Sequence, residues 1–235
     1  MKVLEGKSIT KSYDGTAIIE DVSLYVKEGE IVALLGVSGV GKSTLFNIMS
    51  GLEKPDKGEV YLEEECITGS AGHIGYMQQS DLLLPFKTVI KNVMIPLSLS
   101  GVDKKEAYSR ALGQLNEFGL GEYKDMYPCE LSGGMRQRVS LARTFLYGKK
   151  VMLMDEPFSA LDAMTRRDMQ SWFKEKAKEH NIASLLITHD IDEALFLADR
   201  IYVLAGNVGR IVLEIENNAQ IDEEKLKKMI LEKVR

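Results

Sequence analysis

The sequence predicts an α/β protein whose parallel sheet is covered by helices on both faces and interrupted in the chain by a block of helices. Two uninterrupted apolar runs, Ile31–Leu35 and Val151–Met154, have the length of strands and suit strands buried on both faces. From residue 151 onward strand-like and helix-like segments alternate, which is typical of a parallel sheet. Between about residues 88 and 148 apolar residues recur at helical spacing, so we expect the helical block there.

The composition is that of a globular protein with a substantial core. The 235 residues are 45% hydrophobic and 28% charged, enough for one large domain or two small ones. A net charge of −5 disfavours non-specific binding to nucleic acid or to anionic membranes. Two cysteines, Cys66 and Cys129, are too few for a disulfide scaffold or a metal cluster. We expect no secretory signal, because residues 1–15 lack an apolar run, and no membrane span, because no stretch approaches about 18 uncharged apolar residues.

The N-terminal third is expected to be mostly strands. Turn-forming pairs at 14–15 and 28–29 separate its first apolar segments. The elements expected in this part are, in order, the strands Val3–Leu4, Ser8–Tyr13, Ile18–Val26 and Ile31–Leu35, a helix over about Lys42–Met49, and the strands Glu59–Leu62 and Ile74–Met77.

Helices are expected in the middle of the chain and alternate with strands after it. Apolar residues four apart mark the helical block at Val89, Val93 and Leu97 and again at Ala107, Ala111 and Leu115. The later elements expected are the strand Val151–Met154, a helix around Met164–His180, the strand Ser184–Thr188, a short helix near Ile191–Leu197 and the strand Ile201–Leu204. The last segment, Asp222–Arg235, predicts an amphipathic surface helix, to which we assign no function.

Residues 36–44, here called the phosphate loop, match the pattern G-x-x-x-x-G-K-[ST] between an expected strand and an expected helix. The glycines allow consecutive backbone N–H groups to point inward at an anion, and the following helix directs its positive end at the same place. Lys42 is expected to lie between β- and γ-phosphates, and the Ser43 hydroxyl to bind Mg²⁺. The residues predicted to bind ATP here are Gly36, Val37, Ser38, Gly39, Val40, Gly41, Lys42, Ser43 and Thr44.

Two carboxylates, Asp155 and Glu156, follow the second apolar run. The carboxyl end of a buried parallel strand lies at the ligand crevice of an α/β sheet, where Asp155 would reach Mg²⁺. Glu156 points elsewhere and is therefore free to polarise a water for attack on the γ-phosphate. Taken alone, the pair also fits a surface turn or a helix N-cap, but the phosphate loop favours the catalytic interpretation.

Residues 131–143 read LSGGMRQRVSLAR, in which Ser132 can cap a helix and Gly133 and Gly134 loosen its first turn. Such a helix start is a second plausible anion site. The segment resembles the LSGGQ signature of the ABC ATPase superfamily, with Met135 in place of the glutamine, a common variant among bacterial import subunits. The resemblance then extends over roughly residues 10–205.

The resemblance implies a P-loop NTPase fold. Its RecA-like core, with an N-terminal antiparallel β subdomain, would span about residues 1–84 and 145–216. An α-helical subdomain would be inserted at about 85–144, and the C-terminal helix would lie at about 222–235. The whole chain would be one nucleotide-binding domain.

The resemblance also assigns four residues outside the three segments above. Tyr13 is similar to the aromatic residue that stacks on adenine, although a strand tyrosine that packs locally is the alternative. Gln79, preferred to Gln78 because of the residues that follow it, resembles the glutamine that senses Mg²⁺. Asp162, in the segment SALD, resembles the loop that communicates across the dimer, and His189 the switch histidine at the γ-phosphate.

In this family two copies form two ATP sites at a head-to-tail interface. The cis residues would be Lys42, Ser43, Gln79, Asp155, Glu156 and His189, with Glu156, His189 and Lys42 catalytic and Ser43, Gln79 and Asp155 at the metal. Ser132, Gly133 and Gly134 would act in trans on ATP held by the other copy. The implied cofactors are ATP and Mg²⁺. The implied partners are a second copy, or a related chain, and membrane-spanning permease subunits at the cytoplasmic face of the inner membrane.

Two segments resemble different classes of transporter. Residues 82–89, LLLPFKTV, resemble importers of nitrate, sulfonate, taurine and pyrimidine precursors. Residues 93–101, VMIPLSLSG, are similar to lipoprotein-release and macrolide-efflux ATPases. We predict a small-solute importer, with the release or efflux type as the alternative. A soluble ABC ATPase acting on DNA or the ribosome is disfavoured because the chain has no heptad run, no CxxC and a net charge of −5, so no nucleic-acid partner is expected. A plain P-loop kinase or GTPase would leave the signature unexplained.

Overall fold

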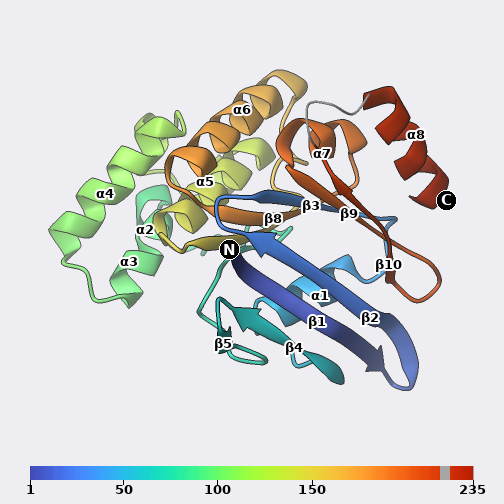
Figure 1. The fold of residues 1–235 in the computed structure, drawn as a ribbon. Coiled ribbons are helices and arrows are strands. Elements are labelled where there is room, and N and C mark those ends of the chain that lie inside the picture. The colour runs from blue at the N-terminus through green and yellow to red at the C-terminus, as the bar shows by residue number, and fades with distance from the viewer. Residues whose placement is uncertain (218–222, 235) are drawn as a thin grey trace.

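A six-stranded sheet forms the centre of this computed structural model, which describes residues 1–217 and 223–234 (Figure 1). Its strand order is β10-β9-β3-β8-β7-β6, and every neighbouring pair is parallel except β10 with β9. The strands are β3 Ile31–Leu35, β6 Gly75–Met77, β7 Val151–Asp155, β8 Ala183–Thr188, β9 Arg200–Ala205 and β10 Arg210–Glu216.

The apolar strands are buried on both faces because successive side chains enter two different cores. On β3, Ile31, Ala33 and Leu35 belong to a core shared with the helices, whereas Val32 and Leu34 belong to a second core on the opposite face. All five residues are buried. This division explains why the run contains no polar residue.

A second, antiparallel sheet covers the face toward which Val32 and Leu34 point. Its order is β2-β1-β4-β5, with β1 Lys2–Tyr13, β2 Thr16–Lys27, β4 Lys57–Leu62 and β5 Glu65–Cys66. Helix α1, Lys42–Met49, contributes its apolar side chains to the same core. β1 is one strand where the sequence predicted two, because register shifts between Gly6 and Ile9 let it continue through Ser8, whose φ is 48°.

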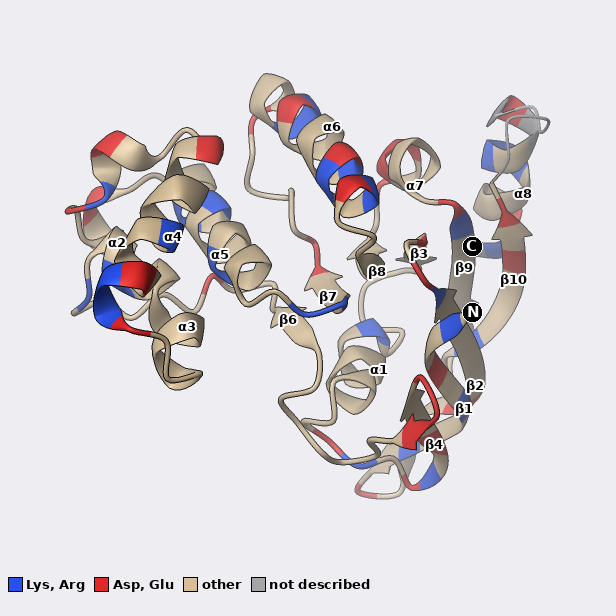
Figure 2. Ribbon diagram, turned by 60° about the vertical axis from the view of Figure 1, so that its left-hand side comes forward, with Lys and Arg blue, Asp and Glu red and all other residues tan. Residues whose placement is uncertain are grey.

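The other helices pack on the opposite face and to one side of the sheet. Helices α2–α5 form the helical block, which stands at one side of the sheet in both views, with α8 at the opposite end (Figures 1 and 2). The bounds are α2 Val89–Val93, α3 Ile95–Leu99, α4 Lys104–Glu117, α5 Gly133–Leu146, α6 Ala163–Glu179, α7 Ile191–Leu197 and α8 Glu223–Val234, with 3₁₀ turns at Gly121–Tyr123 and Pro128–Glu130.

Two further departures from the expected elements have physical causes. The periodic segment at 89–97 is broken into α2 and α3, because Pro96 lacks an N–H donor and lies in the first turn of α3. The edge strands β5 and β10 were not predicted; β10 alternates exposed and half-buried residues and pairs only along one side. In α8, Leu226 and Ile230 are fully buried, while the predicted helix ends Asp222 and Arg235 lie outside the described residues.

Among the residues that the structure describes, none of the helices combines the length and apolar character that crossing a bilayer requires.

A buried carboxyl group lies between α6 and α7. Glu193 is 8% exposed, and its Oε1 accepts a hydrogen bond from Gln170 Nε2 at 2.8 Å. Burial raises the pKa of Glu193 above its ordinary 4.5, and hydrogen bonds from Thr188 and Gln170 oppose the shift. The ionised form of this carboxyl is therefore less favourable in the folded protein than in the unfolded chain.

We predict that Glu193→Gln raises the free energy of unfolding at neutral pH by about 1 kcal/mol. Because the folded pKa is raised, the cost of ionisation is present above that pKa and vanishes below the ordinary value of 4.5. The gain should therefore disappear as the pH falls below about 4.5. Urea unfolding at several pH values measures it, with Glu175→Gln on the exposed face of α6 as control. A gain that does not change with pH would contradict the prediction.

Candidate functional site

The phosphate loop connects β3 to α1 in a conformation that requires glycine. Gly39 and Gly41 have φ values of 83° and 104°, in the left-handed region. A Cβ on Gly36 would lie 2.5 Å from the Leu204 carbonyl oxygen, and one on Gly41 would lie 2.5 Å from Ile19 Cγ2. The loop is thus pressed against the end of β9 and against β2, and side chains at these two positions would displace it.

The first turn of α1 is open to an anion. Gly41 occupies the N-cap position of α1 and offers no side-chain cap, so the first N–H groups of the helix have no partner within it. The preceding residues 37–39 are exposed. Unpaired N–H groups and the positive end of the helix therefore face the same exposed loop, the arrangement in which a helix binds phosphate.

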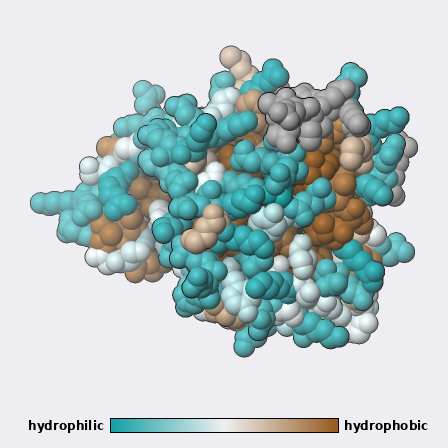
Figure 3. All heavy atoms as spheres, viewed as in Figure 1, coloured by the Kyte–Doolittle hydropathy of each residue, from teal (hydrophilic) through white to brown (hydrophobic). Residues whose placement is uncertain are grey.

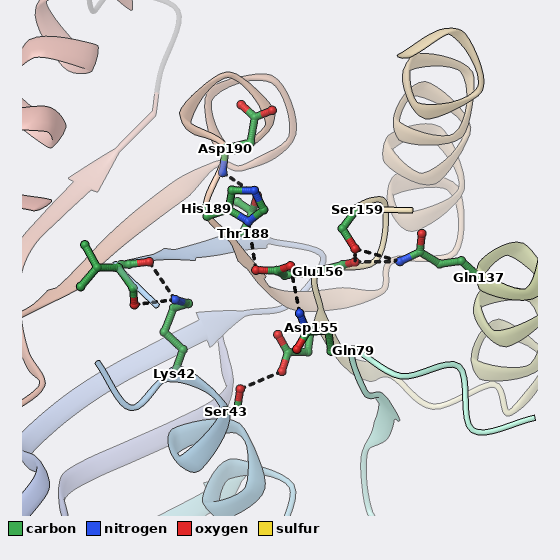
Figure 4. A network of polar contacts seen from close by, with 12 residues as sticks. Lys42, Ser43, Gln79, Gln137, Asp155, Glu156, Ser159, Thr188, His189 and Asp190 are labelled. Atoms are coloured by element: carbon green, nitrogen blue, oxygen red, sulfur yellow. Dashed lines mark hydrogen bonds and ion pairs between the residues drawn. The ribbon is translucent and has the colours of Figure 1, made fainter. Parts of the chain in front are cut away.

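Lys42 places a buried positive charge in this loop. Its side chain folds back so that Nζ donates to the carbonyl oxygens of Gly36 at 2.7 Å and Val37 at 2.9 Å (Figure 4). Burial lowers the pKa of Lys42, and the nearby charges of Glu156 and Asp155 oppose that shift. The ammonium is therefore held within the phosphate loop by two of the loop's own carbonyl oxygens.

Ser43 and Asp155 form a pair of oxygen ligands beside the loop. The Ser43 hydroxyl donates to Asp155 Oδ2 at 3.0 Å, and Asp155 is 5% exposed at the end of β7. Burial raises the pKa of Asp155, and the Ser43 hydrogen bond opposes the shift. A hydroxyl and a carboxylate are the hard oxygen ligands that Mg²⁺ prefers, so the two residues fit this ion.

Glu156 lies at the meeting point of three segments. Its Oε2 accepts from Gln79 Nε2 at 3.2 Å, and its Oε1 lies 3.0 Å from His189 Nδ1 (Figure 4). Gln79 follows β6, Glu156 follows β7 and His189 follows β8, so the carboxyl ends of three parallel strands bring the groups together. The Glu156 side chain is 18% exposed and that of His189 65% exposed, which leaves the carboxylate within reach of a water.

Tyr13 is held in one orientation at the end of β1. Its hydroxyl donates to Glu53 Oε2 at 2.7 Å, and Lys11 Nζ lies 5.3 Å from the ring centroid. Burial raises the pKa of Tyr13 and the Glu53 hydrogen bond adds to the shift, whereas a hydrogen bond with Thr44 of the phosphate loop lowers it. The residue is 42% exposed, so the ring beside the loop can receive a base.

The structure does not bring the signature residues to the phosphate loop of the same chain. Ser132 caps α5 by accepting from Met135 N at 3.2 Å, and it is exposed together with Gly133. No hydrogen bond or ion pair among the described residues joins 132–134 to the loop. Asp162 caps α6 by accepting from Met164 N and Thr165 N, and hydrogen bonds with Thr165 lower its pKa.

Three residues of α5 take part in the site that sequence reasoning did not single out. Arg136 Nε donates to Asp81 Oδ2 at 3.0 Å, and Arg143 donates to the carbonyl oxygens of Asp81 and Leu82. Gln137 points into the segment after Glu156 (Figure 4). The sequence carried only a weak signal for them, a basic helix after the signature, because their partners are distant along the chain.

The strand β3, the phosphate loop, α1 and the acidic end of β7 define a P-loop nucleoside triphosphatase. The family model described as ABC transporter matches residues 19–159. The formylaminopyrimidine import ATP-binding protein ThiZ of Halalkalibacterium halodurans is 42% identical over 206 residues, 87% of this chain and 80% of that protein. The nitrate import ATP-binding protein NrtD of Synechocystis sp. is 39% identical over 206 residues, 88% of this chain and 77% of that protein.

Among solved structures, a dimeric ATP-binding cassette in a post-hydrolysis state with ADP and Pi is similar, with a TM-score of 0.84 at 32% identity. The match covers 92% of this chain and 99% of that one. The chain therefore belongs to the ABC transporter family, as one of its ATP-binding subunits. The predicted fold class, a P-loop NTPase with an inserted helical subdomain, is confirmed.

We predict that Lys42→Ala weakens ATP binding about 10- to 100-fold, since a hydrogen bond to a charged group contributes about 1.5–3 kcal/mol. Titration with a fluorescent ATP analogue measures the affinity. The control is Lys57→Ala, which removes an exposed lysine from β4. Affinity unchanged by Lys42→Ala would refute the assignment of the phosphate loop.

Proposed function

We propose that this chain hydrolyses ATP to energise a membrane importer of a small solute. The observation that carries the proposal is the convergence of Lys42, the Ser43–Asp155 pair and the Gln79–Glu156–His189 cluster at one edge of the sheet. The two relatives named above are import proteins, for formylaminopyrimidine and for nitrate. Their names support an importer of this type over the release or efflux alternative.

In this proposal each residue that acts in cis has a role that follows from its position. The phosphate loop N–H groups and Lys42 bind the phosphates, and Tyr13 stacks on the base. Ser43 and Asp155 would hold Mg²⁺ with Gln79 nearby, and the ion would screen phosphate charge. Glu156 accepts a proton from the attacking water, and His189, hydrogen-bonded to Glu156, orients that carboxylate and faces the γ-phosphate.

A second copy completes the site in this proposal. At the start of α5, Ser132 and Gly133 are exposed and Gly134 is half-buried, and no hydrogen bond or ion pair among the described residues joins them to their own phosphate loop, so they are free to meet phosphates of another chain. The related cassette with ADP and Pi is a dimer, which supports the same arrangement here. Asp162, at the start of α6, would lie near the same interface.

A groove between the helical block and the core is the proposed contact with the membrane-spanning partner. It has a volume of about 420 Å³, and its lining includes Leu52, Ile95, Pro96, Leu99 and Tyr147. Leu99 is 84% exposed and Leu52 is 56% exposed. Hydrophobic residues, coloured brown, also show at the lower edge of the helical block in Figure 3.

A short helix of a permease subunit fits such a groove, because an amphipathic helix can lay its apolar face on exposed leucines. The chain would then be a peripheral protein at the cytoplasmic face of the inner membrane. Its position there would depend on protein contacts rather than on a span of its own.

We predict that Glu156→Gln retains ATP binding but lowers turnover at least about 100-fold, because an amide cannot accept the proton. ATP should then trap a stable dimer, which gel filtration detects. Adding Ser132→Arg to the same chain should abolish the dimer while nucleotide affinity stays near normal. A Glu156→Gln chain that stays monomeric with ATP, or a double variant that still dimerises, would contradict the shared site.

We predict that Leu99→Asp releases the protein from the membrane fraction of its source cells, because a charge would be buried against the permease helix. ATP affinity should not change. Leu231→Asp, which alters a leucine 47% exposed on α8, is the matched control. Equal release of both variants, or of neither, would argue against docking at this groove.

A further inference from the structure

One buried amide joins α5 to the segment that carries Glu156. Gln137 lies in the second turn of α5 and is 5% exposed. Its Nε2 donates to the Glu156 carbonyl oxygen at 2.9 Å and lies 3.3 Å from Ser159 Oγ, while its Oε1 accepts from Ala160 N at 2.8 Å (Figure 4). Both ends of the amide are used, so its orientation is determined by its partners.

The residue held in this way has an unusual backbone. Glu156 has a φ of 50°, a left-handed conformation that is unfavourable for a side chain of this kind. Its N–H donates to the Ile187 carbonyl oxygen at 3.0 Å, and its own carbonyl oxygen accepts from Ser159 Oγ at 3.0 Å and from Gln137. A strained conformation persists only where several contacts maintain it. The contact from Gln137 comes from a different subdomain than the others.

The start of α5 packs on the same segment. A Cβ on Gly134 would lie 3.3 Å from the Ala160 carbonyl oxygen and 3.3 Å from Leu161 Cδ2. Gln137 follows Ser132 by five residues, about 7.5 Å along the helix axis. A displacement of the signature residues therefore moves the amide that holds the Glu156 backbone.

We propose that Gln137 is a positioning residue that maintains the left-handed conformation of Glu156 and thereby aims its carboxylate at the attacking water. This inference rests on the proposed function. The same side chain links the two sites of a dimer, because α5 offers Ser132 to the partner's nucleotide and Gln137 to its own chain's base. Contact of the signature with the partner's phosphates then adjusts the base in the other site.

Two substitutions distinguish the hydrogen bond that the Gln137 amide donates from the one that it accepts. Gln137→Met keeps the volume and removes both hydrogen bonds. Gln137→Glu still accepts from Ala160 N, but it places a carboxylate oxygen against the Glu156 carbonyl oxygen. Both variants should lower kcat at least tenfold with KM for ATP and ATP affinity within about threefold of wild type, because the phosphate loop is untouched. Gln114→Met on α4 is the control and should keep the wild-type kcat.

Two results with these variants would contradict the proposed role of Gln137. Wild-type kcat in Gln137→Met overturns the proposal. Recovery of activity in Gln137→Glu would show that the contact with Ala160 matters rather than that with Glu156, and would overturn it equally. If Lys42→Ala itself hydrolyses ATP normally, the proposed function fails, an outcome distinguishable from failure of this inference alone. Thermal unfolding and ATP affinity verify that each variant is folded.

Mixed dimers identify the site on which Gln137 acts. In the first mixture, a limiting amount of the Gln137→Met chain is combined with an excess of the Lys42→Ala chain. The mixed dimer then has one competent phosphate loop, in the Gln137→Met chain, whose Glu156 lacks its amide contact. In the second mixture, a limiting amount of wild-type chain is combined with an excess of the double variant Gln137→Met/Lys42→Ala. The mixed dimer then has one competent phosphate loop, in the wild-type chain, whose Glu156 keeps its amide contact. The signature that faces this loop comes from the altered α5 of the double variant. Relative to wild type with excess Lys42→Ala, activity should fall in the first mixture and persist in the second. The reverse pattern would mean that Gln137 shapes the signature, and would overturn the proposal.

Discussion

Burial of β3 on both faces is the constraint on which the rest of the structure depends. Its alternating side chains enter two cores, and its neighbours β8 and β9 pair with it in parallel, as is typical of a sheet covered on both faces. In the parallel register Leu35 lies opposite Thr188, and Asp155 lies opposite Ile187 on the next pair. The phosphate loop, the acidic residues and the histidine therefore leave the sheet at one edge. The site is a consequence of how the sheet is buried.

The charges at this edge are held at an energetic cost. Burial lowers the pKa of Lys42 and raises that of Asp155, so both charged forms are less favourable than in water. Phosphate groups would stabilise the ammonium, and a divalent cation would stabilise the carboxylate. Such a site is less stable alone than an apolar one, which is the common relation between stability and function. The strained backbone of Glu156 belongs to the same pattern.

Helix α5 connects the helical block to the residues proposed to catalyse hydrolysis. Arg136 and Arg143 bind the segment that follows Gln79, and Gln137 binds the segment that follows Glu156. The helix begins directly after Ser132, which would face the other copy. One rigid element thus contacts both sides of the proposed catalytic cluster, and the groove proposed for the permease includes Arg143. Nucleotide, second copy and membrane partner would act on the same helix.

The sequence by itself determined those features that depend only on residues close together in the chain. The glycines of the phosphate loop, the strand-length apolar runs and the acidic strand end indicate their structures from neighbouring residues alone. Only the tertiary structure decided the edge strand β10, the left-handed Glu156 and the partners of Gln137. An edge strand is weakly patterned because one side is unpaired, and a helix glutamine looks the same whether it meets solvent or a distant backbone. These features depend on contacts between residues far apart in the chain, which periodicity and spacing do not encode.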